Sequence, residues 1–189
     1  MNAAAAKVES GDPVGEFCNS LERDKGLTAR LRRARNPDEV SALEAVIRLA
    51  DRLAATGLRI GPNSDEYVGA LAILLAQSRV NRDETSSVGK ASLAARLGAK
   101  TNDRRRLSDL RFSRLIHANN VEDRLRQLRR ALRMLDAPLP ARTLAKGWEL
   151  LNSPAGRHRF ARDYFTASDN SAIESENASA IATEQESTP

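Results

Sequence analysis

The sequence has 189 residues, which is enough for one medium-sized domain or two small ones with a real hydrophobic core. Apolar residues make up 41% of the chain and aromatic residues only 4%, a composition that favours packed helices and argues against a β-sandwich. Cys18 is the single cysteine, which excludes an intrachain disulfide and favours a reducing, cytoplasmic location.

Charge is distributed unevenly along the chain. The formal net charge is +5, but residues 1–17 carry one lysine against three acids, and residues 167–189 carry five acids and no base. Of the 30 bases and 25 acids, 29 and 17 therefore lie in residues 18–166, which gives this body a net charge of +12. Such a field favours nucleic acids or acidic surfaces as partners.

The sequence carries no sign of membrane insertion. The first ten residues lack the basic start and the long apolar run of a secretory signal. The longest apolar run, 67–76, is too short to span a bilayer and predicts a buried core helix.

Taken in chain order, the predicted elements are all helical. Residues 1–15 form a leader of small residues, and residues 167–189 lack the large apolar groups that offset chain entropy, so both ends are expected to be disordered. No segment alternates with period two for long enough to predict a strand. We expect seven to nine helices, over 16–26, 27–35, 36–57, 63–79, 90–98, 101–118 (or two helices broken near Ser108), 121–136, 138–152 and 153–167.

Capping residues support these boundaries. Asn36 and Asn120 suit N-caps, Pro37 and Pro154 suit first turns, and Gly26, Gly57 and Gly98 suit helix ends. The polar stretch 81–89 is the best internal boundary. The prediction is therefore an all-α protein of two packed helical bundles, an N-terminal one over 16–80 and a C-terminal one over 90–166.

The stretch 111–135 holds seven arginines and no lysine. On a helical wheel, Val121, Leu125, Leu128, Leu132 and Leu135 form one apolar stripe, and Arg126, Arg129, Arg130 and Arg133 cluster on a separate face. Arg111 and Arg114 project from adjacent turns of the preceding helix, with Arg104, Arg105 and Arg106 upstream, while Arg30, Arg32, Arg33 and Arg35 crowd a short helix in the first half.

Arginine suits phosphate because its planar guanidinium stays charged and donates two parallel hydrogen bonds. A surface exposed only to water would mix both signs, so this pattern predicts mainly phosphate contacts with weak base specificity. The alternative is a basic helical scaffold whose arginines pair with acids on other helices or on acidic protein partners.

Nothing in the sequence predicts an enzyme. His117 and His158 are the only histidines, and neither they nor Cys18 has metal-ligand spacing to another such residue. Glycine-rich phosphate loops and GxSxG or HExxH motifs are absent from the sequence. We therefore expect a non-catalytic protein without cofactor or metal, with Cys18 buried and His117 at a helix C-terminus.

Five segments in order resemble the CasB-type small subunit of the type I-E CRISPR Cascade complex. They are "LRRARNPDEV" (31–40), "SVGKASLAARLG" (87–98), "RFSRLIHANN" (111–120), "LRQLRRAL" (125–132) and "RFARDYF" (159–165). The resemblance covers about 150 residues and implies an all-helical protein of two bundles without catalytic activity.

The resemblance also implies partners. Copies of the subunit pair, contact the backbone and large subunits of the guide-RNA complex, and hold single- and double-stranded target DNA, including the displaced strand, through basic helices. Arg33, Arg111, Arg114, Arg129 and Arg130 match basic family positions, and Lys90 does so more loosely, whereas His117 departs from the pattern. The predicted nucleic-acid-binding residues are therefore Arg32, Arg33, Lys90, Arg111, Arg114, Arg126, Arg129, Arg130 and Arg133.

Overall fold

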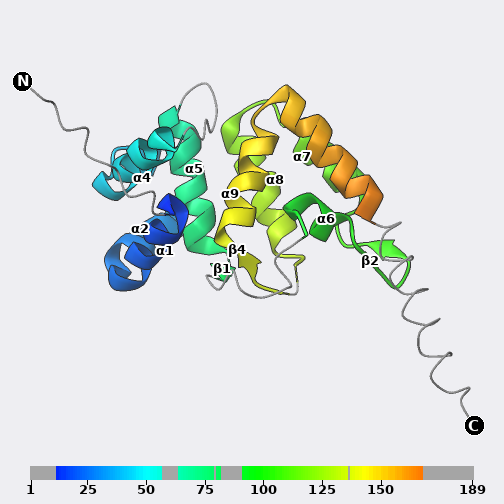
Figure 1. The fold of residues 1–189 in the computed structure, drawn as a ribbon, viewed down its shortest axis with the longest axis horizontal. Helices are drawn as coiled ribbons and strands as arrows, with labels where there is room; N and C mark the ends of the chain where they lie inside the picture. Colours follow the sequence, from blue (N-terminus) through cyan, green and yellow to red (C-terminus); the bar gives the residue numbers. More distant parts are fainter. Residues whose placement is uncertain (1–11, 57–63, 79, 82–90, 136, 168–189) are drawn as a thin grey trace, which may run out of the picture.

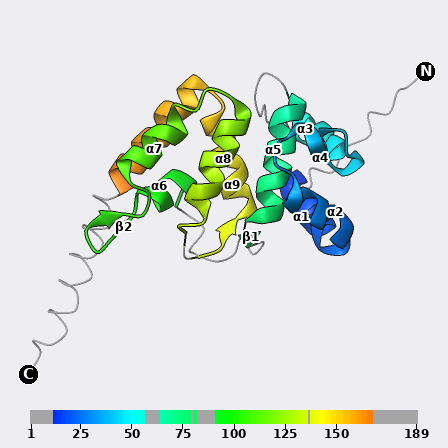
Figure 2. The same ribbon diagram turned by 180° about the vertical axis from the view of Figure 1, so that it is seen from behind.

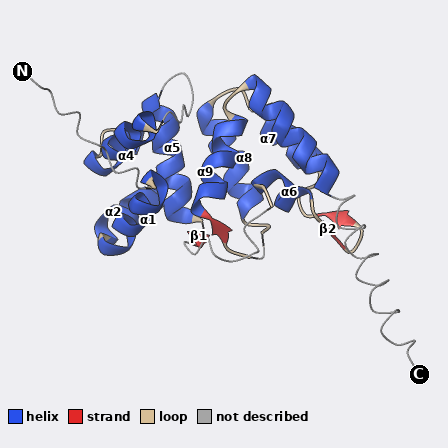
Figure 3. Cartoon of the chain, viewed as in Figure 1, coloured by secondary structure: helices blue, strands red, loops and turns tan. Residues whose placement is uncertain are grey.

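The computed structural model describes residues 12–56, 64–78, 80–81, 91–135 and 137–167. Within these ranges the protein is all-α, as predicted, and its four strands are two residues long each (Figure 3). Most of the leader, nearly all of the linker 81–89 and the acidic tail from residue 168 onward lie outside the described residues.

The N-terminal half contains five helices: α1 (Pro13–Arg23), α2 (Lys25–Arg33), α3 (Asp38–Ser41), α4 (Glu44–Ala55) and α5 (Ser64–Gln77). The C-terminal half contains α6 (Leu93–Gly98), α7 (Asp109–Ile116), α8 (Val121–Leu132), α9 (Ala141–Leu151) and a final helix over 154–167. Figure 1 shows the first group, in blue to cyan, beside the second, in green to orange, and the view from behind agrees (Figure 2).

Helix α5 joins the two halves. It packs against α2, α3 and α4 on one side and against α8 and α9 on the other. Every residue from Val68 to Ala76 is buried, as expected of a helix that is apolar all round. One continuous apolar cluster therefore runs through both halves.

Local capping explains several helix ends. The side-chain oxygen of Asn120 accepts a hydrogen bond from the Asp123 backbone N–H at 2.7 Å, and Ser92 caps α6 through Ala95 at 3.2 Å. The helix α6 ends at Gly98, and Pro154 occupies the first turn of the final helix. These features confirm the predicted start at 121 and the predicted end at 98, and the final helix begins at 154, one residue after its predicted start at 153.

The first predicted boundaries were wrong in two places. Helix α1 begins at Pro13, inside the expected leader, because Asp12 caps it. Gly26 does not end a helix: Asp24 ends α1 and caps α2, accepting a hydrogen bond from the Leu27 N–H at 2.8 Å. A capping carboxylate thus fixes both starts.

The predicted helix over 36–57 is two helices, which raises the number of helices in the described residues to ten. Leu43 has an extended backbone, with φ −71° and ψ 132°, between α3 and α4. This break lets α3 bury Val40 against α5 while α4 turns to bury Val46, Leu49 and Leu53.

The segment 101–118 begins with a hairpin and not with a helix. Strand β2 (Lys100–Thr101) pairs antiparallel with β3 (Arg104–Arg105), and Asn102 and Asp103 form the turn with φ values of 52° and 60°. Asn and Asp tolerate this left-handed conformation better than most residues. Helix α7 starts only after Ser108, where the break was expected. A second pair, β1 (Val80–Asn81) with β4 (Leu139–Pro140), is parallel and links the two halves.

Aromatic side chains close the C-terminal half. The ring of Phe112 stacks on that of Tyr164 with centroids 3.8 Å apart, and Phe160 lies next to it. The Tyr164 hydroxyl hydrogen-bonds to the Leu107 carbonyl and lies 3.0 Å from a carboxylate oxygen of Asp109. These contacts fix α7 against the final helix, and α7 in turn packs against α8.

Candidate nucleic-acid interface

Helix α8 buries its predicted apolar stripe. Val121, Leu125 and Leu128 are buried, and Leu132 and Leu135 are half-buried against the core. The arginines of α8 therefore have to leave the helix on its other sides. The structure divides them among four different environments.

Arg124 is the one arginine of 121–135 that the helical wheel did not place on the clustered basic face. It is 4% exposed, donates to the Asn152 side-chain oxygen at 2.8 Å and to the Ala118 carbonyl at 2.7 Å, and its Nε has no hydrogen-bond partner in the described structure. Burial, together with the nearby charge of Arg157, lowers the pKa of this guanidinium. Arg124 joins α8 to the end of α9, so its role is structural.

Arg126 lies outside the clustered arginines. Its guanidinium donates to the Asp123 carboxylate at 2.7 Å on the exposed surface. This hydrogen bond is the main reason that the pKa of Asp123 is lowered. An exposed pair of this kind adds little to stability, and it partly neutralises Arg126 as a phosphate ligand.

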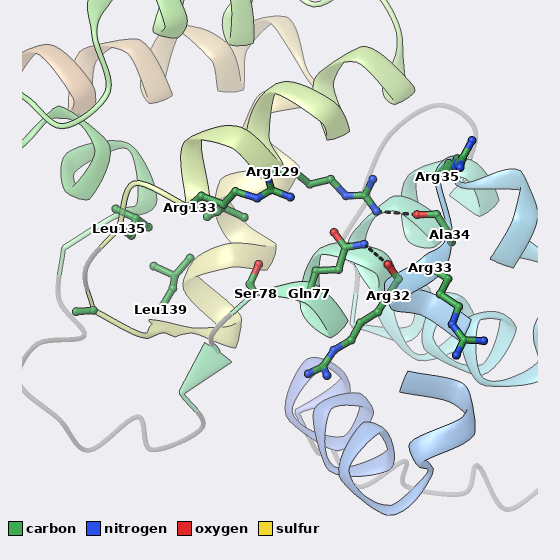
Figure 4. Close-up of a pocket in the computed structure, with 12 residues that line it drawn as sticks. Arg32, Arg33, Ala34, Arg35, Gln77, Ser78, Arg129, Arg133, Leu135 and Leu139 are labelled. Carbon is green, nitrogen blue, oxygen red and sulfur yellow. Dashed lines mark hydrogen bonds between the residues drawn. The ribbon is translucent and has the colours of Figure 1, made fainter. Parts of the chain in front are cut away.

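The remaining arginines of α8 line two grooves. The first, which we call the junction groove, lies where α2, the end of α5 and α8 meet (Figure 4), and it has a volume of about 920 Å³. Five arginines line it: Arg32, Arg33, Arg35, Arg129 and Arg133. Leu132, Leu135 and Leu139 provide apolar lining, and no carboxylate is among its lining residues in the described structure.

Two of these arginines also donate hydrogen bonds to backbone carbonyls. Arg129 donates through Nη2 to the Ala34 carbonyl at 2.8 Å, which links the two halves across the groove (Figure 4). Arg32 donates through Nε to the Ala76 carbonyl at 2.8 Å and so links α2 to α5 within the N-terminal half. Burial, then the charge of Arg133, lowers the pKa of Arg129, while Glu39 acts in the opposite direction. Arg33, Arg35 and Arg133 are exposed and stand at the rim.

The second groove, which we call the α7–α8 groove, has a volume of about 360 Å³. It brings together Arg111 and Arg114 of α7 with Arg130 and Arg133, and all four side chains are exposed. Leu107, Gln127, Ala131 and Met134 form the rest of its described lining, and a guanidinium nitrogen of Arg111 lies 3.3 Å from the Met134 sulfur. The described lining again contains no carboxylate.

Arg133 lines both grooves, and we call the arginines that line the two grooves the arginine track. Of the predicted nucleic-acid-binding residues, the structure places seven on this track: Arg32, Arg33, Arg111, Arg114, Arg129, Arg130 and Arg133. Lys90 lies outside the described residues. Arg35 was not in the predicted set, although the density of arginines over 30–35 was a signal for it.

Other kinds of site find no support in the described part of the chain. No group of three or more His, Cys, Asp and Glu side chains within it could hold a metal ion. His117 ends α7 and its ring nitrogen lies 2.9 Å from the Ser113 carbonyl, and Cys18 is buried, both as expected. None of the described helices combines the length and the apolar character that a membrane crossing requires.

Comparison with protein families identifies a family that matches most of the chain. Residues 27–165 match the family "CRISPR-associated protein Cse2", and this range contains both grooves. The chain belongs to the Cse2 family. Cse2 proteins are small subunits of type I-E Cascade, so the resemblance seen in the sequence is confirmed, and the protein is a structural subunit of that CRISPR complex.

Neither the comparison with curated proteins nor the comparison with solved structures gave a significant match. The Cse2 match stops at residue 165, just before the last residues of the final helix. The acidic segment that follows is therefore a feature of this chain outside the matched region.

Proposed function

We propose that this Cse2 protein binds target DNA in Cascade, including the displaced strand, through phosphate contacts along the arginine track. The observation that carries the proposal is the convergence of exposed Arg111, Arg114, Arg130 and Arg133 in one groove whose described lining has no acid. Like charges held together on a surface repel one another. Each of these arginines attracts a phosphate, so a bound row of phosphates offsets the repulsion between them.

Contacts of this kind to the phosphate backbone of DNA suit the displaced strand. Opening DNA and pairing it with guide RNA exchanges two duplexes of similar stability, so a few contacts to the released strand can shift the balance. Arginine forks bind phosphate without reading sequence, as a surveillance complex with many targets requires. The subunit then acts by binding, without a catalytic step of its own.

The test compares two double variants with equal loss of charge. Arg111→Gln/Arg130→Gln removes two exposed arginines of the α7–α8 groove, whereas Arg48→Gln/Arg52→Gln removes two from α4, where they pair with Glu44 and Glu16. Single-strand binding by assembled Cascade is measured against salt. The groove variant should lower the slope of log K against log [salt] by about 1.4, because each lost contact contributes about 0.7.

The control variant should keep the original slope and the original lifetime of the open DNA complex. Equal slopes for both variants would contradict the proposal, because they would mean that only net charge matters. If the groove variant bound DNA normally but lost another Cascade subunit on purification, the arginines would instead serve as a scaffold for an acidic protein partner.

We further propose the backbone subunits, the large subunit and a second copy of this chain as its protein partners, in a cytoplasmic complex. Membership in the Cse2 family supports a place among other Cascade subunits and nucleic acids. Purification of the tagged chain with its complex, followed by mass measurement of the intact assembly, would give the partners and the copy number. An assembly without guide RNA would contradict this part of the proposal.

A further inference from the structure

We infer that the junction groove holds the sugar–phosphate backbone of a strand and that the bound strand ties the two halves of the protein together. This inference rests on the proposed function and assigns the groove a second effect, stabilisation of the junction. It is carried by the origin of the lining residues, by the apolar floor and by the polar contacts across the groove.

The lining charges come from both halves. Arg33 and Arg35 stand at the end of α2, and Arg129 and Arg133 belong to α8 and its C-terminal turn. In the free protein these cations line one groove from both halves, and no carboxylate is among its described lining residues. Their repulsion opposes the apolar packing of α5 against α8 and α9, and a polyanion between them would remove it.

The direct polar contacts leave room for such a ligand. Arg129 bridges the halves through Ala34, but its Nε is buried and has no hydrogen-bond partner in the described structure. Burial lowers the pKa of the same guanidinium, so its charge is poorly compensated in the free protein. A phosphate in the groove would supply a compensating charge.

The shape and the lining indicate which anion fits. A volume of about 920 Å³ is far greater than a single phosphate needs and lies within the usual range of ligand sites. Leu132, Leu135 and Leu139 also line it, and Leu135 and Leu139 lie beside Arg133, away from Arg33 and Arg35 (Figure 4). A strand of alternating phosphates and deoxyriboses matches this arrangement, with phosphates at the rims and sugars on the leucines, and bases are not needed.

The experiment uses the full chain and an abasic deoxyribose-phosphate dodecamer, with a normal oligothymidine dodecamer and tripolyphosphate for comparison. Hydrogen exchange is followed by mass spectrometry in the segments 29–35 and 128–135, one from each half. At 100 times its dissociation constant, the abasic strand should raise Tm by about 5–10 °C. It should also slow exchange in both segments.

Two double variants locate the effect. Arg33→Gln/Arg35→Gln changes two exposed rim residues, so it should fold and lose the joint protection of 29–35 and 128–135. Arg111→Gln/Arg114→Gln, a matched loss of two charges in the other groove, should keep that joint protection when the strand is added to saturation.

Several outcomes would overturn the inference and leave DNA binding standing. These are protection confined to 128–135, joint protection that survives in Arg33→Gln/Arg35→Gln, and binding of oligothymidine but not of the abasic strand. Tripolyphosphate as effective as the abasic strand would also overturn it, because sugars on the leucine floor would then contribute nothing. Failure of both strands to bind would reject the proposed function as well.

Discussion

Arg129 and Arg130 are neighbours on α8 with the same chemistry and different surroundings, and replacing each by methionine separates a structural arginine from a binding one. Arg129 is half-buried and donates to the Ala34 carbonyl in the other half of the protein. Arg130 is exposed in the α7–α8 groove. Methionine keeps the unbranched apolar stem and removes the charge and the donors.

The expected loss follows from the contact with Ala34. That residue is 2% exposed, so its carbonyl has little access to water once the guanidinium is gone. A hydrogen bond from a charged donor contributes about 1.5–3 kcal/mol, and release of a poorly compensated buried charge offsets part of this. We expect Arg129→Met to lower the free energy of unfolding by about 2 kcal/mol and Tm by about 4–8 °C. Arg130→Met should change it by less than about 0.5 kcal/mol.

Urea unfolding measures both variants. The single tryptophan, Trp148, is fully buried, and its indole N–H donates to the Tyr67 carbonyl at 3.0 Å, so its fluorescence reports on the junction between α9 and α5. Far-UV circular dichroism gives the helical content in the same samples. Single-strand binding should fall for Arg130→Met without any change in the unfolding midpoint. Equal midpoints for the two variants would refute the structural role assigned to Arg129.

Three further predictions concern the fold that presents the grooves. Gly98→Ala would place a Cβ against the Tyr164 carbonyl oxygen, much closer than a van der Waals contact. We expect this substitution to lower the free energy of unfolding by about 2 kcal/mol or more, as measured by thermal unfolding. Gly26→Ala, on an exposed turn of α2, should have little effect. Arg124→Met should lower the free energy of unfolding by about 2–4 kcal/mol in urea, because it removes both hydrogen bonds of that guanidinium, and an unchanged midpoint would contradict this. Burial raises the pKa of Tyr164, and its hydrogen bond to Asp109 acts in the same direction, so the neutral phenol stabilises the fold below the unfolded-state pKa of about 10 and this stability is lost as pH rises above it. Unfolding scans between pH 9 and pH 11 should therefore show a steeper fall for the natural protein than for Tyr164→Phe.

Much of the local structure could be predicted from neighbouring residues. The start of α8 depends on Asn120 and that of the final helix on Pro154, and these act within a single turn. The apolar stripe of Val121, Leu125 and Leu128 needs only the helical period. For the same reason the arginine-rich faces of α7 and α8 were visible before any fold was known, as was the all-α class.

Contacts between distant segments, and local signals that compete with one another, decided the rest. The break at Leu43 arises because α3 and α4 bury different faces against α5, and such packing leaves no local signal. The hairpin at 100–105 depends on an Asn102–Asp103 turn in a stretch whose arginines and leucines also suit a helix.

The sequence by itself determined that this protein is basic and all-helical, because composition and helical period are local properties. It also determined that the arginines outnumber the acids near them in the sequence. Only the tertiary structure decided what each arginine does. Arg124 is buried because α9 covers it, Arg126 is paired within its own turn, and Arg129 reaches the other half. Arg130 and Arg133 stay exposed because α7 and α2 bring further arginines beside them and no described acid, so a track suited to phosphate remains.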